Sequence, residues 1–333
     1  MEKETRGKKF LKSKMFTLLL LEAALIVLFS VWARAVGNNF FAFNTFVTLL
    51  DSLVVTSFLA IGAGCLLVSG EIDLSQAAVG AFGGVLVAMA VKYWMLPWPL
   101  AVVITLVLCG AFGAVNAVLV TKFSFQSFIA TLAMASVIQG IMMFVSVPPN
   151  STSPQSVVFQ NAGLKFIGSY KILGLFPFAI FLMLAAFIVY GLVMNRSKFG
   201  LRVYLIGGNP TASWLAGIDP KRMLLFLFVN SAILGGVAGV LAAARAMQGG
   251  LSALGTAQFT GLTAAVLGGI SFGGGTGGLG GAFVGLVIIN TFQAGMAIVN
   301  VSPFWTNAFS GLILLIALVM DYFSKRSSGV SLH

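Results

Sequence analysis

Long apolar runs, separated by short polar stretches, form the dominant pattern of this chain. Most of them approach the ~20 residues that an α-helix needs to cross a hydrocarbon core about 30 Å thick. The pattern therefore predicts an all-α integral membrane protein with about ten transmembrane helices, since helices satisfy their own backbone hydrogen bonds within lipid. The expected segments lie at about residues 15–36, 45–69, 75–92, 99–121, 126–147, 172–194, 223–246, 259–270, 279–299 and 305–323.

Two stretches interrupt the apolar pattern within the predicted membrane region. The first is 69–75, with the sequence SGEIDLS, and the second is 268–278, with the sequence GGISFGGGTGG. The run at 259–270 is too short to span a membrane alone, so we interpret it as a half-helix that the glycine-rich stretch completes. Paired interruptions in the two halves of a chain indicate a transport pathway. The candidate pathway residues of the second interruption are Gly268, Gly269 and Gly274.

The polar segment 195–222 contains the signals of a short, separately capped helix. Asn209 suits the N-cap, Pro210 the first helical position, and Gly217 the position after the C-cap. Trp214 and Leu215 of this helix need either the chain's own surface or a partner protein to bury them. An amphipathic helix on the lipid surface is the alternative, but such helices carry many cations on their polar face. Residues 209–217 contain no charge, which favours partner docking through Asn209, Pro210, Ala212, Trp214, Leu215 and Gly217.

Composition and charge agree with a membrane protein and orient it. Hydrophobic residues make up 59% of the chain and charged residues 8%, whereas soluble domains carry about 25% charged residues. The net charge of +11 would suit a nucleic-acid partner, but the 19 Lys and Arg residues are unevenly distributed. The predicted topology places five on one side (Arg34, Lys92, Lys165, Lys171 and Arg245) and the remainder on the other. This positive-inside bias predicts that both termini, 1–14 and 324–333, are cytoplasmic, and nucleic acid is not an expected partner.

The chain is predicted to be a single transmembrane domain, 1–333, without catalytic or metal chemistry of its own. Cys65 and Cys109 fall inside apolar runs and are expected as small core residues without a disulfide. The single histidine, His333, leaves little basis for histidine catalysis or a metal site. The glycines at 268–281 are not followed by the Lys-Ser/Thr of a phosphate-binding loop. The chain is therefore not expected to be an enzyme, and any ATP hydrolysis would belong to another polypeptide.

Carboxylates beside or within the apolar runs are candidates for the pathway, because an ionised carboxylate at mid-bilayer costs roughly 3 kcal/mol or more. Glu71 and Asp73 lie in the first interruption, where three roles remain open. The three roles are a gate at the cytoplasmic end of the pathway, a helix cap made by Asp73 with Ser75, or a proton relay. Asp51 and Glu22 lie deeper in apolar runs and need a partner, a cavity or a proton.

No partner for Asp51 or Glu22 follows from the sequence, in which the nearest cations are Arg34 and Lys92. Large amides form the other polar group of the predicted spans. They suit a path for a polyhydroxylated solute, and the alternative is interhelical hydrogen bonding worth about 0.6 kcal/mol each. The amides are Asn116, Gln139, Asn230, Asn290 and Gln293.

Three motifs, in matching order, resemble bacterial ABC permeases for monosaccharides, with similarity from about residue 44 to 321. Residues 70–75, GEIDLS, resemble the Gly-Gly-Ile-Asp-Leu-Ser element of that family. Residues 204–210, YLIGGNP, with Ala212, Leu215, Gly217 and Ile218, resemble its cytoplasmic loop, and 264–275, AAVLGGISFGGG, resemble its third signature. The chain departs from the family at Glu71, Gln76 and Trp214, where Gly, Val and a smaller residue are expected.

The resemblance implies the permease subunit of an importer in a bacterial plasma (inner) membrane. Two permease copies, identical or sister chains, would form the pore. Two ABC ATPase subunits would hold ATP–Mg, and a periplasmic or lipid-anchored binding protein would deliver the solute. Residues 209–217 would be the coupling helix, with Trp214 and Leu215 in a groove of the ATPase. A monosaccharide is the expected cargo. A nucleoside, an autoinducer or a branched-chain amino acid is the alternative cargo within the superfamily, and an ion-coupled secondary transporter is the rival class.

Overall fold

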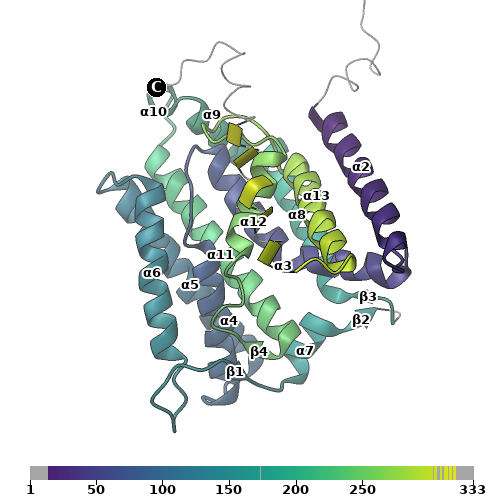
Figure 1. Ribbon diagram of the computed structural model, residues 1–333. Coiled ribbons are helices and arrows are strands. Elements are labelled where there is room, and N and C mark those ends of the chain that lie inside the picture. The colour runs from purple at the N-terminus through teal and green to yellow at the C-terminus, as the bar shows by residue number, and fades with distance from the viewer. Residues whose placement is uncertain are drawn as a thin grey trace, which may run out of the picture.

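The computed structural model describes residues 14–172, 174–302, 304–305, 308–309, 311–313, 315–316 and 318–319, and these residues form a helical bundle (Figure 1). Seven described helices are long and apolar enough to cross a membrane, and α4 (Gln76–Lys92) and α12 (Ala257–Leu267) are shorter apolar helices. The run expected at 305–323 lies partly outside the described residues. The seven are α2 (Lys14–Ala35), α3 (Phe43–Val68), α5 (Trp98–Thr121), α6 (Ser127–Val145), α8 (Phe178–Arg196), α11 (Pro220–Ala246) and α13 (Leu279–Ile298).

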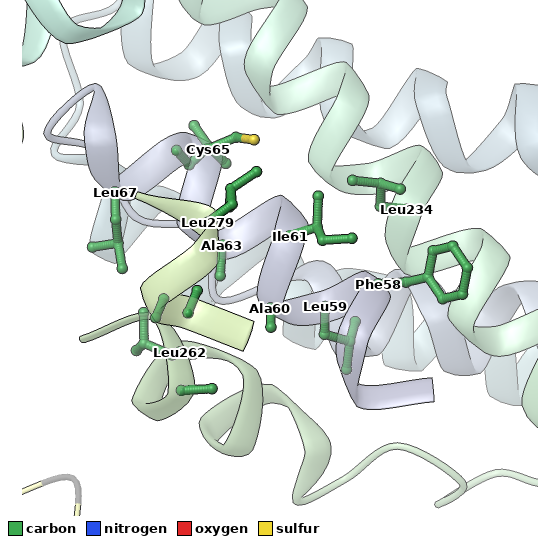
Figure 2. Packing of buried hydrophobic residues seen from close by; sticks show 14 of the residues in the cluster. Phe58, Leu59, Ala60, Ile61, Ala63, Cys65, Leu67, Leu234, Leu262 and Leu279 are labelled. Atoms are coloured by element: carbon green, nitrogen blue, oxygen red, sulfur yellow. The ribbon is translucent and has the colours of Figure 1, made fainter. Parts of the chain in front are cut away.

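Helix α3 occupies the centre of the bundle and packs against α8, α11, α12 and α13. Its apolar residues reach the neighbouring helices on several sides, so the second half of α3 is buried almost all round. Leu59 and Ile61 have no exposed surface, and Figure 2 shows them with Leu234 of α11, Leu262 of α12 and Leu279 of α13. A helix that is apolar on every face is typical of a bundle centre.

Helices α4 and α11 approach each other at backbone distance because glycines face each other. A Cβ added at Gly239 would lie 1.7 Å from the carbonyl oxygen of Gly80, and one added at Gly80 would lie 2.6 Å from that of Gly235. Small residues at such crossings allow the close packing that replaces the hydrophobic effect inside a membrane. Side chains at these positions would force the two helices apart.

The two ends of the bundle carry different short elements. One end, here the α10 end, carries α9 (Lys198–Gly208) and α10 (Pro210–Leu215). The opposite end, the α7 end, carries α7 (Ala162–Ser169) and two small antiparallel pairs (Figure 1). In the first pair, Val157 of β1 (Val157–Val158) lies opposite Gly249 of β4 (Gln248–Gly249); in the second, β2 (Lys171–Ile172) pairs with β3 (Phe176–Pro177).

Helix α2 lies at the edge of the bundle and is attached to α13 mainly near one end. The Phe29 ring fills the space beside Gly295, where a Cβ would lie 2.4 Å from the ring. Phe29 belongs to a small cluster with Ala33, Phe40, Met296 and Val299. Nearer its other end, α2 leaves an apolar cavity of about 590 Å³ against α12 and α13.

Candidate functional site

The short helix predicted at 209–217 is present as α10, with the expected caps. The Asn209 side chain accepts a hydrogen bond from the backbone N–H of Ala212 at 2.9 Å, and Pro210 occupies the first turn. Gly217 follows the C-cap with a φ of +80°, in the left-handed region that favours glycine. The Gly217 N–H donates to Trp214 O and the Ile218 N–H to Ser213 O, which is the hydrogen-bond pair of a Schellman motif.

Helix α10 presents two large apolar side chains away from the rest of the chain. Trp214 is 65% exposed and Leu215 is 74% exposed, whereas Ser213 on the inner side is buried. Its caps fix the helix locally, so these side chains do not depend on tertiary contacts for their position. The described residues therefore leave a two-residue apolar surface at the α10 end uncovered.

The backbones of both interruptions come together beside Gly207 and Gly208, the last residues of α9 before α10. The Gly275 N–H donates to the Val68 carbonyl oxygen at 2.8 Å. A Cβ added at Gly207 would lie 1.9 Å from that same oxygen and 2.5 Å from Gly275 N. A Cβ at Gly274 would lie 2.7 Å from Gly70 N and 2.9 Å from Gly207 O. We call this contact the glycine junction, and it comprises Val68, Gly70, Gly207, Gly208, Gly274 and Gly275.

The first interruption continues from the glycine junction into a buried polar network around Asp73. The Asp73 Oδ1 atom accepts from the N–H and the hydroxyl of Ser75 at 2.8 and 2.6 Å, and Oδ2 accepts from the Ser231 hydroxyl at 2.9 Å. Asn116 donates its amide to the Ser75 hydroxyl at 2.8 Å. Asp73 therefore fixes the residue that leads into α4 and links it to α11, but it is not the predicted helix cap, because the N-cap of α4 is Ser75 and makes no side-chain cap hydrogen bond.

Side chains from two more helices, α6 and α12, hydrogen-bond the backbone of the first interruption. Ser127 and Thr131 of α6 accept from the N–H groups of Ile72 and Leu74. Gln258 of α12 donates to the Asp73 carbonyl oxygen at 2.9 Å and accepts from the Ala77 N–H at 2.7 Å. Non-helical backbone is tolerated in a membrane only where such partners satisfy its polar groups.

The second interruption packs against the start of α13. A Cβ added at Gly281 would lie 2.0 Å from the Gly268 carbonyl oxygen. Gly269 has a φ of +100° and Gly277 one of +94°, conformations that other residues rarely adopt. The Tyr204 hydroxyl of α9 donates to the Gly277 carbonyl oxygen at 2.8 Å. The glycine-rich stretch is thus a bend that joins α12, α13 and α9.

The structure gives Asp51 a partner that the sequence did not reveal. Arg245, near the end of α11, forms an ion pair with the Asp51 carboxylate, and its Nη1 donates to the Asp51 carbonyl oxygen at 2.8 Å. Glu22 accepts from the Thr291 hydroxyl of α13 at 2.7 Å. Neither carboxylate pairs with Arg34 or Lys92, the nearest cations in sequence. Glu71 is half-buried beside Ser127.

Several of the predicted amides hydrogen-bond between helices, so that interpretation of them is confirmed. Asn230 of α11 accepts from the Tyr190 hydroxyl of α8 at 2.5 Å. Asn290 of α13 accepts from the Ser52 hydroxyl of α3 at 3.2 Å. Gln139 instead is exposed and lines a groove of about 370 Å³ between α4, α6 and 251–259, together with Ser252, Gly255 and Gln258.

Within the described residues, no group of three or more His, Cys, Asp or Glu side chains could hold a metal ion. Cys65 and Cys109 are free and buried, as expected of small core residues. The site therefore consists of a short capped helix with an exposed apolar surface, two interrupted membrane segments and a buried polar network. These parts define a class: a multi-pass membrane permease.

The comparison with known proteins gives the family. Residues 45–318 match the family model described as the permease component of the branched-chain amino acid transport system. The chain belongs to this family of ABC transporter permeases. The family resemblance that the sequence motifs indicated is confirmed.

The curated relatives are sugar-transport permeases. The L-arabinose transport system permease protein AraH of Escherichia coli is 30% identical over 305 residues, covering 90% of this chain and 89% of that protein. The ribose import permease protein RbsC of Bacillus subtilis is 29% identical over 273 residues, covering 82% and 83%. The xylose transport system permease protein XylH of Escherichia coli is 29% identical over 378 residues, covering 97% and 95%. No solved structure matches the chain.

Proposed function

We propose that this protein is the translocation subunit of an ATP-driven importer whose cargo is a monosaccharide. Its relatives carry the names of arabinose, ribose and xylose systems and match it over nearly their full length, which supports the sugar class. The energy comes from separate ABC ATPase subunits that bind ATP–Mg. The permease itself binds no cofactor and hydrolyses nothing.

The observation that carries the proposal is the position of α10 next to the glycine junction. Trp214 and Leu215 project from a capped helix that begins at Pro210, two residues after Gly208. Gly207 lies at backbone distance from Val68, directly before the first interruption, and from Gly275 in the second, and Gly208 lies beside Gly275. A movement imposed on α10 by a docked ATPase therefore reaches 69–75 and 268–278 without crossing a flexible linker. This is the coupling role that the motif resemblance implied for 209–217.

The translocation path is proposed to involve a second permease copy, identical or a sister chain. The groove between α4, α6 and 251–259 is lined mainly by apolar side chains, among which Gln139, Ser252 and Gln258 supply polar groups. A second copy covering α6 would enclose this groove. Gln258 also binds the backbone of Asp73, so the groove borders the network that holds the first interruption. Glu71, Asp73, Ser75 and Asn116 would then control access rather than bind the solute.

The proposed topology has ten membrane segments, with α12 as a half-helix and both termini in the cytoplasm. The α10 end is the cytoplasmic side because it carries Arg196, Lys198, Arg202, Lys221 and Arg222, in agreement with the positive-inside rule. The α7 end then faces the binding protein, outside the bacterial inner membrane. The N-terminal segment 1–14 and the tail 324–333 lie outside the described residues, apart from Lys14.

The test is co-purification of the tagged permease from its host in mild detergent, with mass spectrometry of bound proteins. An ABC ATPase is expected with the wild type and is expected to be lost from the Trp214→Glu/Leu215→Glu variant. Val158→Glu is the matched control, because Val158 is 57% exposed at the opposite end. Retention of the ATPase by the folded double variant would refute docking through α10. A permease that takes up sugar with an ion gradient and without ATP would refute the importer.

A further inference from the structure

A polar cavity of about 570 Å³ opens between α3, α7, α11 and 253–257, away from the glycine junction. Its volume lies within the range of about 300–1,000 Å³ that small-molecule sites occupy. The Asp51–Arg245 ion pair forms part of its wall. Three other polar side chains face it, from separate elements: Thr56 of α3, Ser169 at the end of α7, and Lys171 of β2.

The wall of this cavity is rich in unused hydrogen-bond donors. A guanidinium carries five N–H donors, and Arg245 directs one from each Nη to Asp51. The Lys171 ammonium forms no ion pair within the described residues and is exposed. The Asp51 carboxylate offsets one of the two positive charges. Such a wall suits a neutral solute with many oxygen acceptors better than an apolar one.

The cavity also adjoins the groove proposed above as the translocation path. Leu254 lines both spaces, with Ala253 and Ala257 on the side of the cavity and Ser252 and Gln258 on the side of the groove. Leu254 is 3% exposed and packs on α4 where Gly80 leaves room for it. The turn segment 250–256 is therefore a thin partition between a space open at the α7 end and a space beside the Asp73 network.

We propose that this cavity is an entry site for the solute within each permease chain, in which Arg245, Lys171, Thr56 and Ser169 bind the hydroxyl groups of a monosaccharide. The inference rests on the proposed function, since it places the site on the outer side and on the route of the sugar. The solute leaves the binding protein, occupies this cavity, and passes the partition at Leu254 into the groove. Among the described residues the wall contains no aromatic side chain, and the binding is accordingly weak enough for transit.

Cysteine protection tests the site directly in the full-length permease. Ser169→Cys introduces a thiol into the cavity, and Ser156→Cys is the matched control, an exposed serine of the same outer loop that does not line the cavity. Cys65 and Cys109 are buried and give a low background. The rate of labelling by a membrane-impermeant maleimide is measured with L-arabinose, D-ribose, D-xylose, D-galactose or D-glucose, and with glycine at the same concentration.

At least one sugar is expected to slow labelling of Ser169→Cys severalfold and to leave Ser156→Cys unchanged. In the Ser169→Cys background, Lys171→Gln is expected to raise the half-protecting sugar concentration about tenfold, because a charged donor is lost. Lys165→Gln is the control, since Lys165 is exposed on α7 outside the cavity. Absence of protection by all five sugars, equal protection by glycine, or an unchanged concentration in Lys171→Gln would overturn the site.

Failure of this site can be separated from failure of the proposed function. The same variants are reconstituted with the ATPase and the binding protein, and ATP-driven sugar uptake is measured. Uptake of a sugar that gives no protection overturns the entry site and leaves the importer intact. Absence of ATP-driven uptake by the wild type overturns the importer itself.

Discussion

The backbone N–H of Gly275 donates a hydrogen bond to the carbonyl oxygen of Val68 at 2.8 Å. Val68 is the last residue of α3, directly before the first interruption, and Gly275 lies inside the second. Gly207 packs on the same hydrogen bond from α9. Two segments from opposite halves of the chain and the entry to α10 therefore share one backbone contact.

The glycine junction predicts that Gly207→Ala uncouples the permease from its ATPase. The added methyl would lie 1.9 Å from the Val68 carbonyl oxygen, so the backbone must move. Gly208→Ala is the adjacent control, because nothing lies within 4 Å of its added Cβ. The measurement is sugar-stimulated ATP hydrolysis in the reconstituted complex, with the thermal midpoint of each permease measured alongside. Normal coupling in folded Gly207→Ala would contradict the junction.

The Asp73 network predicts that Asp73→Asn destabilises the protein. The Asp73 carboxylate accepts three hydrogen bonds in a buried site, and an amide replaces one acceptor oxygen with a donor. Loss of a buried partner costs about 1–3 kcal/mol. Asp219→Asn is the control, because Asp219 caps α11 in an exposed position and Asn caps a helix equally well. Equal unfolding midpoints for the two variants in detergent would argue against the network.

The Asp51–Arg245 pair predicts a measurable coupling energy between α3 and α11. Its side chains are 28% and 24% exposed, so water screens the pair only in part. A double-mutant cycle with Asp51→Ala and Arg245→Ala is expected to give a coupling of about 1–3 kcal/mol in unfolding free energy. The pair Asp219–Arg222 is exposed, at 49% and 83%, and is expected to give about 0.5 kcal/mol or less. Similar values for both pairs would show that the partly buried Asp51–Arg245 pair does not hold α3 and α11 together.

Gln76 of α4 packs closely against Gly62 of α3, and this contact predicts that a change at Gln76 can suppress a change at Gly62. A Cβ added at Gly62 would lie 2.1 Å from Gln76 Nε2, so Gly62→Ala is expected to lower the thermal midpoint. Adding Gln76→Ala removes that side-chain clash, and the double variant is expected to lose less stability than the sum of the two single changes. Gly191→Ala of α8 is the control, since nothing lies within 4 Å of its added Cβ. If the stability losses of the two single variants simply add in the double variant, Gln76 and Gly62 are not in contact.

The elements that the sequence predicted well are those specified by local chemistry. Apolar runs gave most of the described helices to within a few residues, because one continuous run is enough to define a membrane span. Asn209, Pro210 and Gly217 defined α10 for the same reason, since each acts on its own helix end. The prediction at 172–194 was wrong at its start, since α8 begins only at Phe178, after the β2–β3 pair. Helix α9 was not predicted, although Ser197 caps it and its buried positions Val203 and Ile206 have helical spacing.

The contacts that the sequence did not predict join residues far apart in the chain. Arg245 and Asp51 are 194 positions apart, and Ser231 and Asp73 are 158 apart. Each residue has a plausible role on its own helix, but nothing local specifies which faces of two helices meet. Gln76, which departs from the family motif, became interpretable only when Gly62 and Gly235 were seen to leave room for it.

The attachment of α2 has a consequence for biosynthesis. The ring of Phe29 packs beside Gly295 of α13. Its packing site is therefore synthesised only after nearly all the intervening chain. Until α13 enters the bilayer, α2 must persist as a solitary span, stable through its own backbone hydrogen bonds and its lipid-facing side chains. Helix α2 therefore packs onto the bundle only after α13 has been inserted. A helix that is synthesised before α3 to α13 thus becomes one of the last to pack into the bundle.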